Sequence, residues 1–434
     1  MSFKKTAISM ASLALLMPIA NAAQDNAEFN PVVVYGAGFG EPVEQALPQT
    51  EVISNVQIRK SGLNTVGDIL EKVGNVYMRQ DLSGNMNTSP DIRGYGATAS
   101  NNTVILIDGV KISQNEQAPA RIWNVPVEAI DHIEIIRGSS SVLYGEGATS
   151  GVINIITNKQ KDNIGVVSVG AGSYGTYTTN AYASKNLDNL KISVFGKTVN
   201  SNGYRDQSSS NLRSGGINLD YQVQNNLLLG FKYGEDKNYT LLPGYLTLTK
   251  YAQNPTQAQS ALTSLYNDQA VNSTGRGKLT SAYLKYRESD SEYLLDVSRR
   301  DSSTDYFNTS WYEDDLYKSR QDAINAKVKL SNFLLQSNTA IFGMGAAHSY
   351  RNNSSNALEN ASWYQLAGLA SIGFTSQNSN AYFVQDDWKL TDIDRVTVGY
   401  RKEYFRQNAS SIGTDLNYAT PYTQLQSGKN DLNA

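Results

Sequence analysis

The order of apolar and polar positions changes character at Ile164. Beyond this residue, segments of about ten residues alternate in polarity and are separated by turn residues, which is typical of antiparallel strands. The alternation is clearest in three segments. In the first, Leu227, Leu229, Phe231 and Tyr233 lie on one face and Gly230, Lys232 and Gly234 on the other. In the second and third, Ala282, Leu284 and Tyr286 oppose Ser281, Tyr283, Lys285 and Arg287, and Val396, Val398 and Tyr400 oppose Thr397, Gly399 and Arg401. A soluble β-sandwich and a membrane barrel both alternate in this way.

The lengths of the connections separate these two folds. Short turns are expected at 186–189, 224–226, 289–291, 331–332 and 391–394, and long polar loops near 201–211, 236–276, 302–317 and 351–377. This alternation of short and long connections is typical of a transmembrane barrel. Aromatic residues that would supply an interfacial girdle stand near segment ends, at Tyr382, Trp388, Tyr400 and Tyr404. Residues 164–434 are therefore predicted to form an antiparallel transmembrane β-barrel.

Residues 50–160 are patterned as a compact α+β unit. An amphipathic helix is predicted over Val66–Val73, with Thr65 as its N-cap and Gly74 at its end. Strands are expected at Val52–Ser54, at Thr103–Gly109 with a final Asp-Gly turn, at Ile133–Ile136 and at Val152–Ile156. Four glycines between the last two strands indicate tight bends or close backbone approach: Gly138, Gly145, Gly147 and Gly151.

The first 49 residues fit neither unit. Residues 1–22 are predicted to be a secretory signal peptide, because Lys4 and Lys5 precede an apolar core and Ala20-Asn21-Ala22 fits the cleavage rule. A membrane anchor is disfavoured because the apolar run is too short to span a bilayer. Residues 23–49 are expected to form a flexible tail, rich in proline and glycine, around one apolar run at 32–35.

Composition narrows the function. The 434-residue chain has a formal net charge of -3, so no nucleic-acid partner is implied. It contains no cysteine and two histidines, which excludes thiol chemistry and leaves little material for a histidine metal site. The acidic run at 311–315 lacks the ligand spacing of a calcium loop, and no paired carboxylate or nucleophile constellation is present. We therefore expect no enzyme activity, no cofactor and no bound metal.

The most specific signal is the stretch at 128–159, EAIDHIEIIRGSSSVLYGEGATSGVINIITNK. It closely resembles the end of the plug domain of TonB-dependent outer-membrane receptors. Two further motifs of that family match RGYG at 93–96 and LIDGV at 106–110, so the resemblance covers residues 29–160 densely. The motif positions are Gly94, Tyr95, Gly96, Asp108, Gly109, Gly138, Tyr144, Gly145 and Gly151. A dinucleotide-binding loop is the rival interpretation, but its third glycine would fall at Ser150.

The resemblance implies a barrel of about 22 strands, blocked by an N-terminal α+β plug and embedded in the lipid of the bacterial outer membrane. The run Val32, Val33, Val34 and Tyr35 takes the place of the TonB box, a free strand for a TonB-type periplasmic energy-coupling protein. Its alternative is a first strand of the plug, and the box is favoured because nothing nearby is expected to pair with it. By resemblance, Arg93 and Arg137 would face carboxylates of the barrel wall.

The function implied by the resemblance is active transport of a scarce solute, most often a ferric siderophore. Aromatic residues of the outer loops suit such a ligand, and the candidates are Tyr245, Tyr251, Tyr266, Trp311, Tyr312 and Trp363. Cobalamin, haem, copper and glycans stay open as cargo; His348 is a possible haem ligand, whereas His132 is expected to be structural. The alternative functions are a passive porin, a surface-binding barrel and a non-functional truncated receptor.

The number of strands leaves the barrel incomplete. About eleven strands are expected, the last near 395–406, which is half of the number that the resemblance implies. We therefore expect the chain to stop within an outer loop and a continuation to supply about eleven more strands. A fragment of a longer chain and a truncated gene are both consistent with this count.

Val33→Pro is expected to abolish uptake and to leave ligand binding unchanged. Proline removes a backbone donor from the strand that would add to the sheet of the coupling protein. Energised uptake and binding of labelled ligand, both measured on the same cells, separate the two effects. Uptake by Val33→Pro at the rate of the unsubstituted protein would contradict the prediction.

Overall fold

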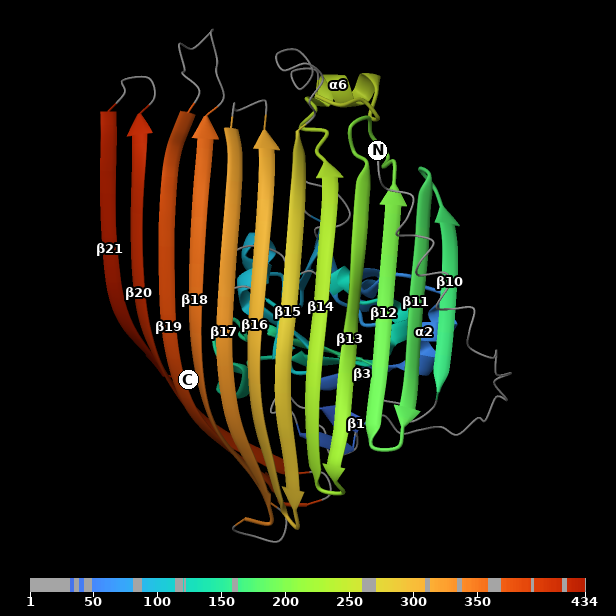
Figure 1. Cartoon of the computed structure of the whole chain (residues 1–434), viewed down its shortest axis with the longest axis vertical. Coiled ribbons are helices and arrows are strands. Elements are labelled where there is room, and N and C mark those ends of the chain that lie inside the picture. The colour runs from blue at the N-terminus through green and yellow to red at the C-terminus, as the bar shows by residue number, and fades with distance from the viewer. Residues whose placement is uncertain are drawn as a thin grey trace.

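The structure is a computed structural model that describes residues 32–34, 39–42, 49–80, 88–113, 120, 122–157, 163–259, 271–308, 313–333, 338–357, 368–391, 394–415 and 420–433. A large antiparallel sheet forms a curved wall, and a smaller α+β unit, the plug, lies against one face of it (Figure 1). The expected signal peptide at 1–22 lies outside the described residues. No helix in the described part of the chain is long and apolar enough to cross a membrane.

The wall contains twelve strands, each hydrogen-bonded to the next in chain order. They are β10 (Ile164–Gly172), β11 (Thr176–Leu187), β12 (Leu190–Ser201), β13 (Ser210–Gln224), β14 (Leu227–Leu241), β15 (Asn272–Glu288), β16 (Ser291–Asn308), β17 (Glu313–Ser331), β18 (Asn338–Ala357), β19 (Gly368–Lys389), β20 (Arg395–Asp415) and β21 (Thr420–Asn433). The expected antiparallel β architecture is confirmed. β10 and β21 are the two ends of this order, so the sheet is not closed within the described chain.

β21 exceeds the expected count of about eleven strands, and it lies where an outer loop was expected. Its sequence, TPYTQLQSGKNDLN, shows little alternation of apolar and polar residues. It nevertheless pairs with β20 from Thr420 opposite Asp415 to Asn433 opposite Lys402. A strand that continues beyond the apolar zone of a barrel needs no apolar face, so its pattern gives no strand signal. The expectation of a loop was wrong for this reason.

The connections gather at two ends of the wall (Figure 1). Successive strands approach each other at one end of the wall in the pairs β11/β12, β13/β14, β15/β16, β17/β18 and β19/β20, and we call this the turn end. They approach each other at the opposite, loop end in the pairs β12/β13, β14/β15, β16/β17 and β18/β19. The long loop expected at 302–317 was wrong, because β16 and β17 extend to 308 and from 313. The loops expected at 236–276 and 351–377 are also partly strand, again in polar sequence.

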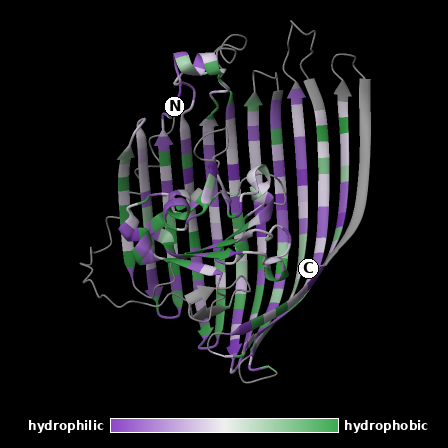
Figure 2. Cartoon of the chain, turned by 180° about the vertical axis from the view of Figure 1, so that it is seen from behind, coloured by the Kyte–Doolittle hydropathy of each residue, from purple (hydrophilic) through white to green (hydrophobic). Residues whose placement is uncertain are grey.

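The two faces of the wall differ as the alternation predicted. Lys232 of β14 faces the plug, where it pairs with Asp108, while Leu229 and Phe231 of the same strand are exposed on the outer face. Other exposed apolar side chains of the outer face are Val297, Ile324, Val396, Val398 and Tyr400. Figure 2 shows apolar and polar positions alternating along the strands. One face therefore suits lipid, and the other suits a polar interior.

The plug is built on a five-stranded sheet of order β3-β8-β9-β6-β7, beside a separate pair β4-β5. Its strands are β3 (Thr50–Ser54), β4 (Tyr77–Gln80), β5 (Thr88–Asp91), β6 (Thr103–Ile107), β7 (Val110–Lys111), β8 (Ile130–Arg137) and β9 (Gly151–Thr157). Its helices are α2 (Asn55–Ser61), α3 (Val66–Lys72), α4 (Ala99–Asn102) and α5 (Ser141–Tyr144), with 3-10 turns η2 (Gly96–Thr98), η3 (Ile122–Asn124) and η4 (Val127–Ala129). Tyr182 and Leu212 of the wall join the hydrophobic core of the plug, so the two units share one cluster.

The helix predicted at 66–73 forms as α3, and its end differs from expectation. The hydroxyl of Thr65 accepts the N–H of Asp68 at 3.1 Å, as an N-cap does. The C-cap is Val73 in a right-handed conformation, so Gly74 is not a left-handed cap. A Cβ at Gly74 would lie 2.6 Å from Cδ1 of Ile135. The glycine is needed because a β-strand side chain packs against it.

The apolar run at 32–35 is not unpaired. β1 (Val32–Val34) pairs antiparallel with β2 (Gly40–Pro42), with Val33 opposite Glu41. The expectation that nothing nearby pairs with the run was wrong. The sequence Gly40-Glu41-Pro42 has low strand propensity, so only the fold reveals this pairing. Phe39, directly before β2, is buried, whereas Tyr35 lies outside the described residues.

A chain of buried polar groups crosses the plug sheet. Nδ1 of His132 lies 2.7 Å from Asp131 and Nε2 lies 3.1 Å from Glu134. Asn154 donates to Glu134 at 2.9 Å and accepts the N–H of Gly109 at 3.1 Å. Glu134 is fully buried, and a buried carboxylate requires partners of this kind. His132 therefore lies in the plug core.

The environment of His132 favours its charged form. Burial by itself lowers the pKa of His132, but its hydrogen bonds to Asp131 and Glu134 and the charges of these carboxylates outweigh burial and raise the pKa from 6.5 to about 9. Because the folded-state pKa is raised, the stabilisation is fully present below pH 6.5 and is lost as the pH rises through about 9. The shift corresponds to about 3 kcal/mol.

We expect the thermal stability of the plug to fall between pH 6.5 and about 9, and His132→Gln to be less stable at pH 6.5 and to lose this dependence. Calorimetry measures the stability, and an NMR titration of the imidazole measures the pKa directly. His348→Gln assigns the signals, because the chain has two histidines, and should leave the stability profile unchanged. A pKa of His132 at or below 6.5 would contradict the argument.

Candidate functional site at the plug–wall interface

The turn between β6 and β7 presents a carboxylate to the wall. Asp108 (φ 51) and Gly109 (φ 84) both have positive φ, as the predicted Asp-Gly turn requires. The Asp108 carboxylate accepts the N–H of Thr157 at 2.8 Å and its hydroxyl at 2.6 Å, and it pairs with the ammonium of Lys232 on β14. The side chain of Asp108 is 1% exposed. This ion pair is therefore withdrawn from water, where it is most sensitive to the loss of one partner.

A second carboxylate, Glu128 of η4, faces the wall at β10–β12. Ser168 of β10 and Asn180 of β11 both donate to its Oε1, the latter at 3.2 Å. Lys197 of β12 stands opposite Asn180 and is 3% exposed. The negative charges of Glu128 and Asp68 act on its ammonium group. Within the described residues, the Lys197 ammonium has no hydrogen-bond partner. The attraction between Lys197 and Glu128 therefore acts through space, at low dielectric.

Two wall arginines contact the plug through backbone carbonyls. Arg300 of β16 donates to the carbonyl of Ile112 at 2.5 Å. Arg401 of β20 donates to the carbonyl of Val142 at 3.3 Å and pairs with Glu403 at 2.7 Å. In these contacts the wall supplies the hydrogen-bond donors, charged or neutral, and the plug supplies the acceptors.

The predicted plug arginines lie elsewhere. Arg137 donates within the plug, to Glu51 at 2.8 Å and to the carbonyl of Gly74 at 2.5 Å. Arg93 is exposed and forms no ion pair with any residue that the structure describes; its guanidinium lies beside Gly138. A contact of either arginine with a wall carboxylate stays a prediction.

Sequence reasoning did not single out the wall cations. Lys232 and Arg401 stand on the polar face of strands whose alternation was recognised, so the inward direction was available as a signal. Arg300 lies in a stretch where no alternation was noted. The partners of all three could not be found from sequence, because pairing depends on how the plug docks.

The glycines of the plug motifs allow tight turns and close contact between the plug backbone and the wall. Gly94 and Gly96 flank Tyr95 in a turn whose N–H groups, from Tyr95 and Gly96, donate to Asp91 at 2.8 Å each. At Gly145 (φ 74), after Tyr144 ends α5, a Cβ would lie 2.7 Å from the guanidinium of Arg401. Gly145 thus admits a wall arginine to the plug backbone. Gly138 and Gly151 also have positive φ.

Two predicted ligand residues share one braced loop at the loop end. Tyr245 and Tyr251 are exposed, the second on α6 (Leu248–Gln253). Arg205, from the connection at 202–209, donates to the carbonyls of Gly244 at 2.7 Å and Gln257 at 3.0 Å and so fixes this loop. The other candidates, Tyr266, Trp311, Tyr312 and Trp363, lie outside the described residues. A ligand role for any of them stays a prediction.

His348 of β18 lies on the outer face. Its Nδ1 is 2.7 Å from Oδ1 of Asn378, and it shares its side of the strand with the exposed residues Phe342, Met344 and Tyr350. This face is turned away from the plug. Nothing in its position therefore favours haem ligation.

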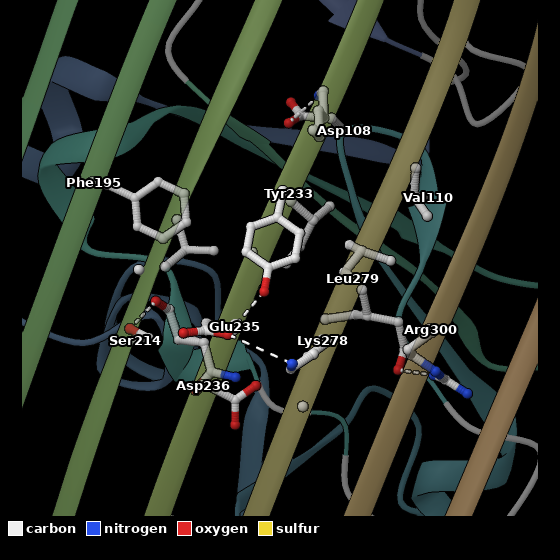
Figure 3. A pocket seen from close by; sticks show the side chains of 18 of the residues that line it. Asp108, Val110, Phe195, Ser214, Tyr233, Glu235, Asp236, Lys278, Leu279 and Arg300 are labelled. Atoms are coloured by element: carbon white, nitrogen blue, oxygen red, sulfur yellow. Dashed lines mark hydrogen bonds and ion pairs between the residues drawn. The ribbon is translucent and has the colours of Figure 1, made fainter.

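Two cavities lie between the plug and the wall. The first, of about 120 Å³, is mostly apolar on its plug side, at Ile107, Val110, Ile112 and Val125. Figure 3 shows Asp108 and Val110 behind the strands that carry Phe195, Ser214 and Arg300. The second, of about 140 Å³, separates α5 and β7 from β16–β20 and is lined by charged residues: Lys111, Glu146, Asp296, Arg300, Lys327, Arg401 and Glu403.

A plug docked by its carboxylates and carbonyls on the polar face of an antiparallel transmembrane wall defines a class, the plugged β-barrels of the outer membrane. The family model of the TonB-dependent Receptor Plug Domain matches residues 42–152. Residues 42–152 therefore match the plug domain of the TonB-dependent receptors, and the chain is similar to outer-membrane proteins of that type.

Two relatives are a vitamin B12 transporter and an iron-regulated outer membrane protein. The chain is 30% identical over 232 residues to the vitamin B12 transporter BtuB of Vibrio vulnificus (strain CMCP6), covering 51% of this chain and 36% of that protein. It is 26% identical over 438 residues to the iron-regulated outer membrane virulence protein of Vibrio cholerae, covering 94% and 60%. The chain thus spans at most 60% of the length of these two relatives.

Solved structures share the fold. The ferric yersiniabactin uptake receptor FyuA from Yersinia pestis superposes with a TM-score of 0.73 at 17% identity, over 88% of this chain and 60% of that one. The unliganded ferric citrate transporter FecA gives a TM-score of 0.68 at 14% identity, over 90% and 60%. At these identities the likeness concerns the fold alone.

We expect Asp108→Asn to destabilise the docked plug more than the double variant Asp108→Asn/Lys232→Met. The single variant leaves the Lys232 ammonium buried without a carboxylate, which costs about 3–5 kcal/mol, whereas the double variant removes both charges. Denaturant unfolding of the protein in detergent measures the two free energies.

The matched control is Glu51→Gln, which removes the partner of Arg137 from a half-exposed pair within the plug. Its expected cost is about 0–1 kcal/mol. A loss in Asp108→Asn no larger than that in Glu51→Gln would refute the importance of the buried pair.

Proposed function

We propose that this protein drives TonB-dependent active transport of a scarce solute across the bacterial outer membrane. The observation that carries the proposal is the docked plug: its core continues into the wall through Tyr182 and Leu212, and its carboxylates are bound by wall side chains. A plug held in this way blocks free diffusion. The plug must be displaced before a solute can pass, and a coupling protein supplies the energy for this displacement.

The coupling strand of the proposal is β1 with Tyr35, acting as a TonB box. β1 belongs to a two-stranded sheet with β2 among the described residues, so one of its edges stays available for strand addition. Main-chain hydrogen bonds to an added strand provide affinity with little demand on side chains. A TonB-type periplasmic protein bound there can pull on residues 23–49, the proposed tail, and through them on the plug at 50–160 inside the barrel at 164–434.

The cargo that the relatives favour is a ferric siderophore. Iron regulation stands in the name of one relative, and two structural neighbours are titled as an uptake receptor and a transporter of ferric complexes. Tyr245 and Tyr251 on the braced loop offer flat, exposed aromatic surface to such a complex. Cobalamin is the second candidate, because a vitamin B12 transporter is 30% identical to the chain. On this proposal the protein is a transporter and not an enzyme.

The test deletes residues 32–35 and measures uptake of radiolabelled ferric catecholate, ferric hydroxamate and cobalamin by cells that express the intact protein. We expect energy-dependent uptake of one of these solutes, and we expect the deletion to abolish that uptake while surface binding persists. The reason is that binding uses the loop end, whereas coupling uses β1. Uptake that survives the deletion or collapse of the membrane energy would indicate passive flux and refute the proposal.

A further inference from the structure

The second cavity borders a part of the wall that leaves room for it. The wall residues Gly345, Ala347 and Ala381 face this cavity and are small. Charges of both signs line it, Lys111 from the plug and Arg401 from the wall among them. The cavity is therefore polar, whereas the plug side of the first cavity is mostly apolar. On its plug side, the second cavity therefore offers a hydrated solute charged replacement partners for its water, at Lys111 and Glu146.

The wall holds the plug differently at β10–β14 and at the strands that border this cavity. From β10 to β14, the buried carboxylate of Asp108 and the half-buried carboxylate of Glu128 are bound by wall side chains. At β16 and β20, arginines donate to the backbone carbonyls of Ile112 and Val142. Breaking the first contacts parts a buried ion pair, whereas breaking these arginine contacts leaves neutral plug carbonyls to be hydrated. The β16–β20 side is therefore the side at which plug and wall part more readily.

Phe39 packs beside two residues of the cavity lining, toward the turn end. It is 4% exposed and packs in one cluster with Leu143, Leu294, Ile341 and Phe383. Leu143 and Phe383 also line the cavity, so cluster and cavity share a border. Leu294 and Ile341 stand near the turn-end limits of β16 and β18, closer to the turns than the cavity residues of the same strands. Phe39 thus lies between the cavity and the turn end.

We propose that this cavity is the start of the solute's passage and that Phe39 is the stopper at its periplasmic floor. The proposal rests on the proposed function, because it uses β1 as the strand that is pulled. Phe39 directly precedes β2, the partner of β1, so tension on β1 reaches Phe39 before it reaches the core of the plug. Withdrawal of Phe39 opens the floor, while the carboxylate contacts keep the plug on β10–β14.

The cavity is too small to hold a solute without a movement of the plug. Its volume of about 140 Å³ is below the 300–1,000 Å³ of ordinary ligand pockets, so the plug must also shift away from β16–β20 before a solute passes. The lining suits a hydrophilic solute with ionised groups, which can exchange partners with the pair Arg401–Glu403 at 2.7 Å. An apolar solute would strand these charges.

The first experiment uses thiol labelling of the purified, intact protein with a sulfonated maleimide. The chain contains no cysteine, so each introduced thiol reports only its own position. Ala381→Cys places the thiol in the cavity, and Ser184→Cys places a nearly isosteric thiol at a buried position of β11 on the opposite side. Each is combined with Phe39→Ala, with Phe39→Met, which refills the site, and with Phe333→Ala, an exposed phenylalanine at the turn end.

We expect Phe39→Ala to raise the labelling rate of Ala381→Cys about tenfold, because truncation leaves an opening at the floor of the cavity. Phe39→Met should restore protection, Phe333→Ala should change nothing, and Ser184→Cys should stay protected in all backgrounds. An unchanged rate at Ala381→Cys in Phe39→Ala overturns the stopper. Equal labelling of Ser184→Cys overturns the one-sided passage and indicates general loosening of the plug.

The second experiment separates this inference from the proposed function. Cells expressing Ala381→Cys with native Phe39 are labelled with and without membrane energy, in the presence of ferric catecholate, ferric hydroxamate and cobalamin together. Energy-dependent labelling that Val33→Pro abolishes supports the withdrawal of Phe39 by β1. If Phe39→Ala raises the labelling of Ala381→Cys in the first experiment but labelling does not depend on energy in the second, the passage through the cavity is supported and the withdrawal of Phe39 by β1 is refuted. If only Ser184→Cys is labelled in an energy-dependent way, the passage through the second cavity is refuted, whereas energy-coupled movement of the plug is supported.

Discussion

The buried ion pair between Asp108 and Lys232 fixes the geometry on which the rest of the structure depends. A carboxylate that is 1% exposed is tolerated only where several donors converge, and Asp108 collects them from β9 and from the wall. The same Asp-Gly turn continues through Gly109 and Asn154 to the buried Glu134 and His132. One turn therefore joins the wall to the polar interior of the plug.

Apolar burial and polar contacts divide the work of holding the plug. The shared cluster around Tyr182 and Leu212 supplies non-directional attraction, which a small displacement weakens gradually. The ion pair and the hydrogen bonds of Glu128 are directional, so they set one docked position. The contacts of Arg300 and Arg401 use neutral carbonyls and are exchanged for water at lower cost. A plug with such unequal sides has a built-in preference for where it separates.

The comparisons with known proteins match the part of the chain that contacts the wall. The match to the plug family covers residues 42–152, where the carboxylates and glycines of the interface lie. Structures of receptors for ferric complexes share the fold at 14–17% identity, so backbone architecture persists where side chains do not. Cargo preference is therefore not a property of the fold, and a role of the loop residues Tyr245 and Tyr251 in it stays a prediction.

The sequence by itself determined what depends on neighbouring residues. Alternation fixed which face of β14 and β20 is apolar, Thr65 fixed the start of α3, and Asp108-Gly109 fixed a turn, because each signal acts over a few positions. The motif stretch at 128–159 identified the family in the same local way. Only the tertiary structure decided the pairing of β1 with β2, the strand at β21, the intraplug partner of Arg137 and the wall cations that meet the plug. These depend on register and docking: Arg300 and Ile112 lie 188 positions apart, and no local pattern encodes a contact at that separation.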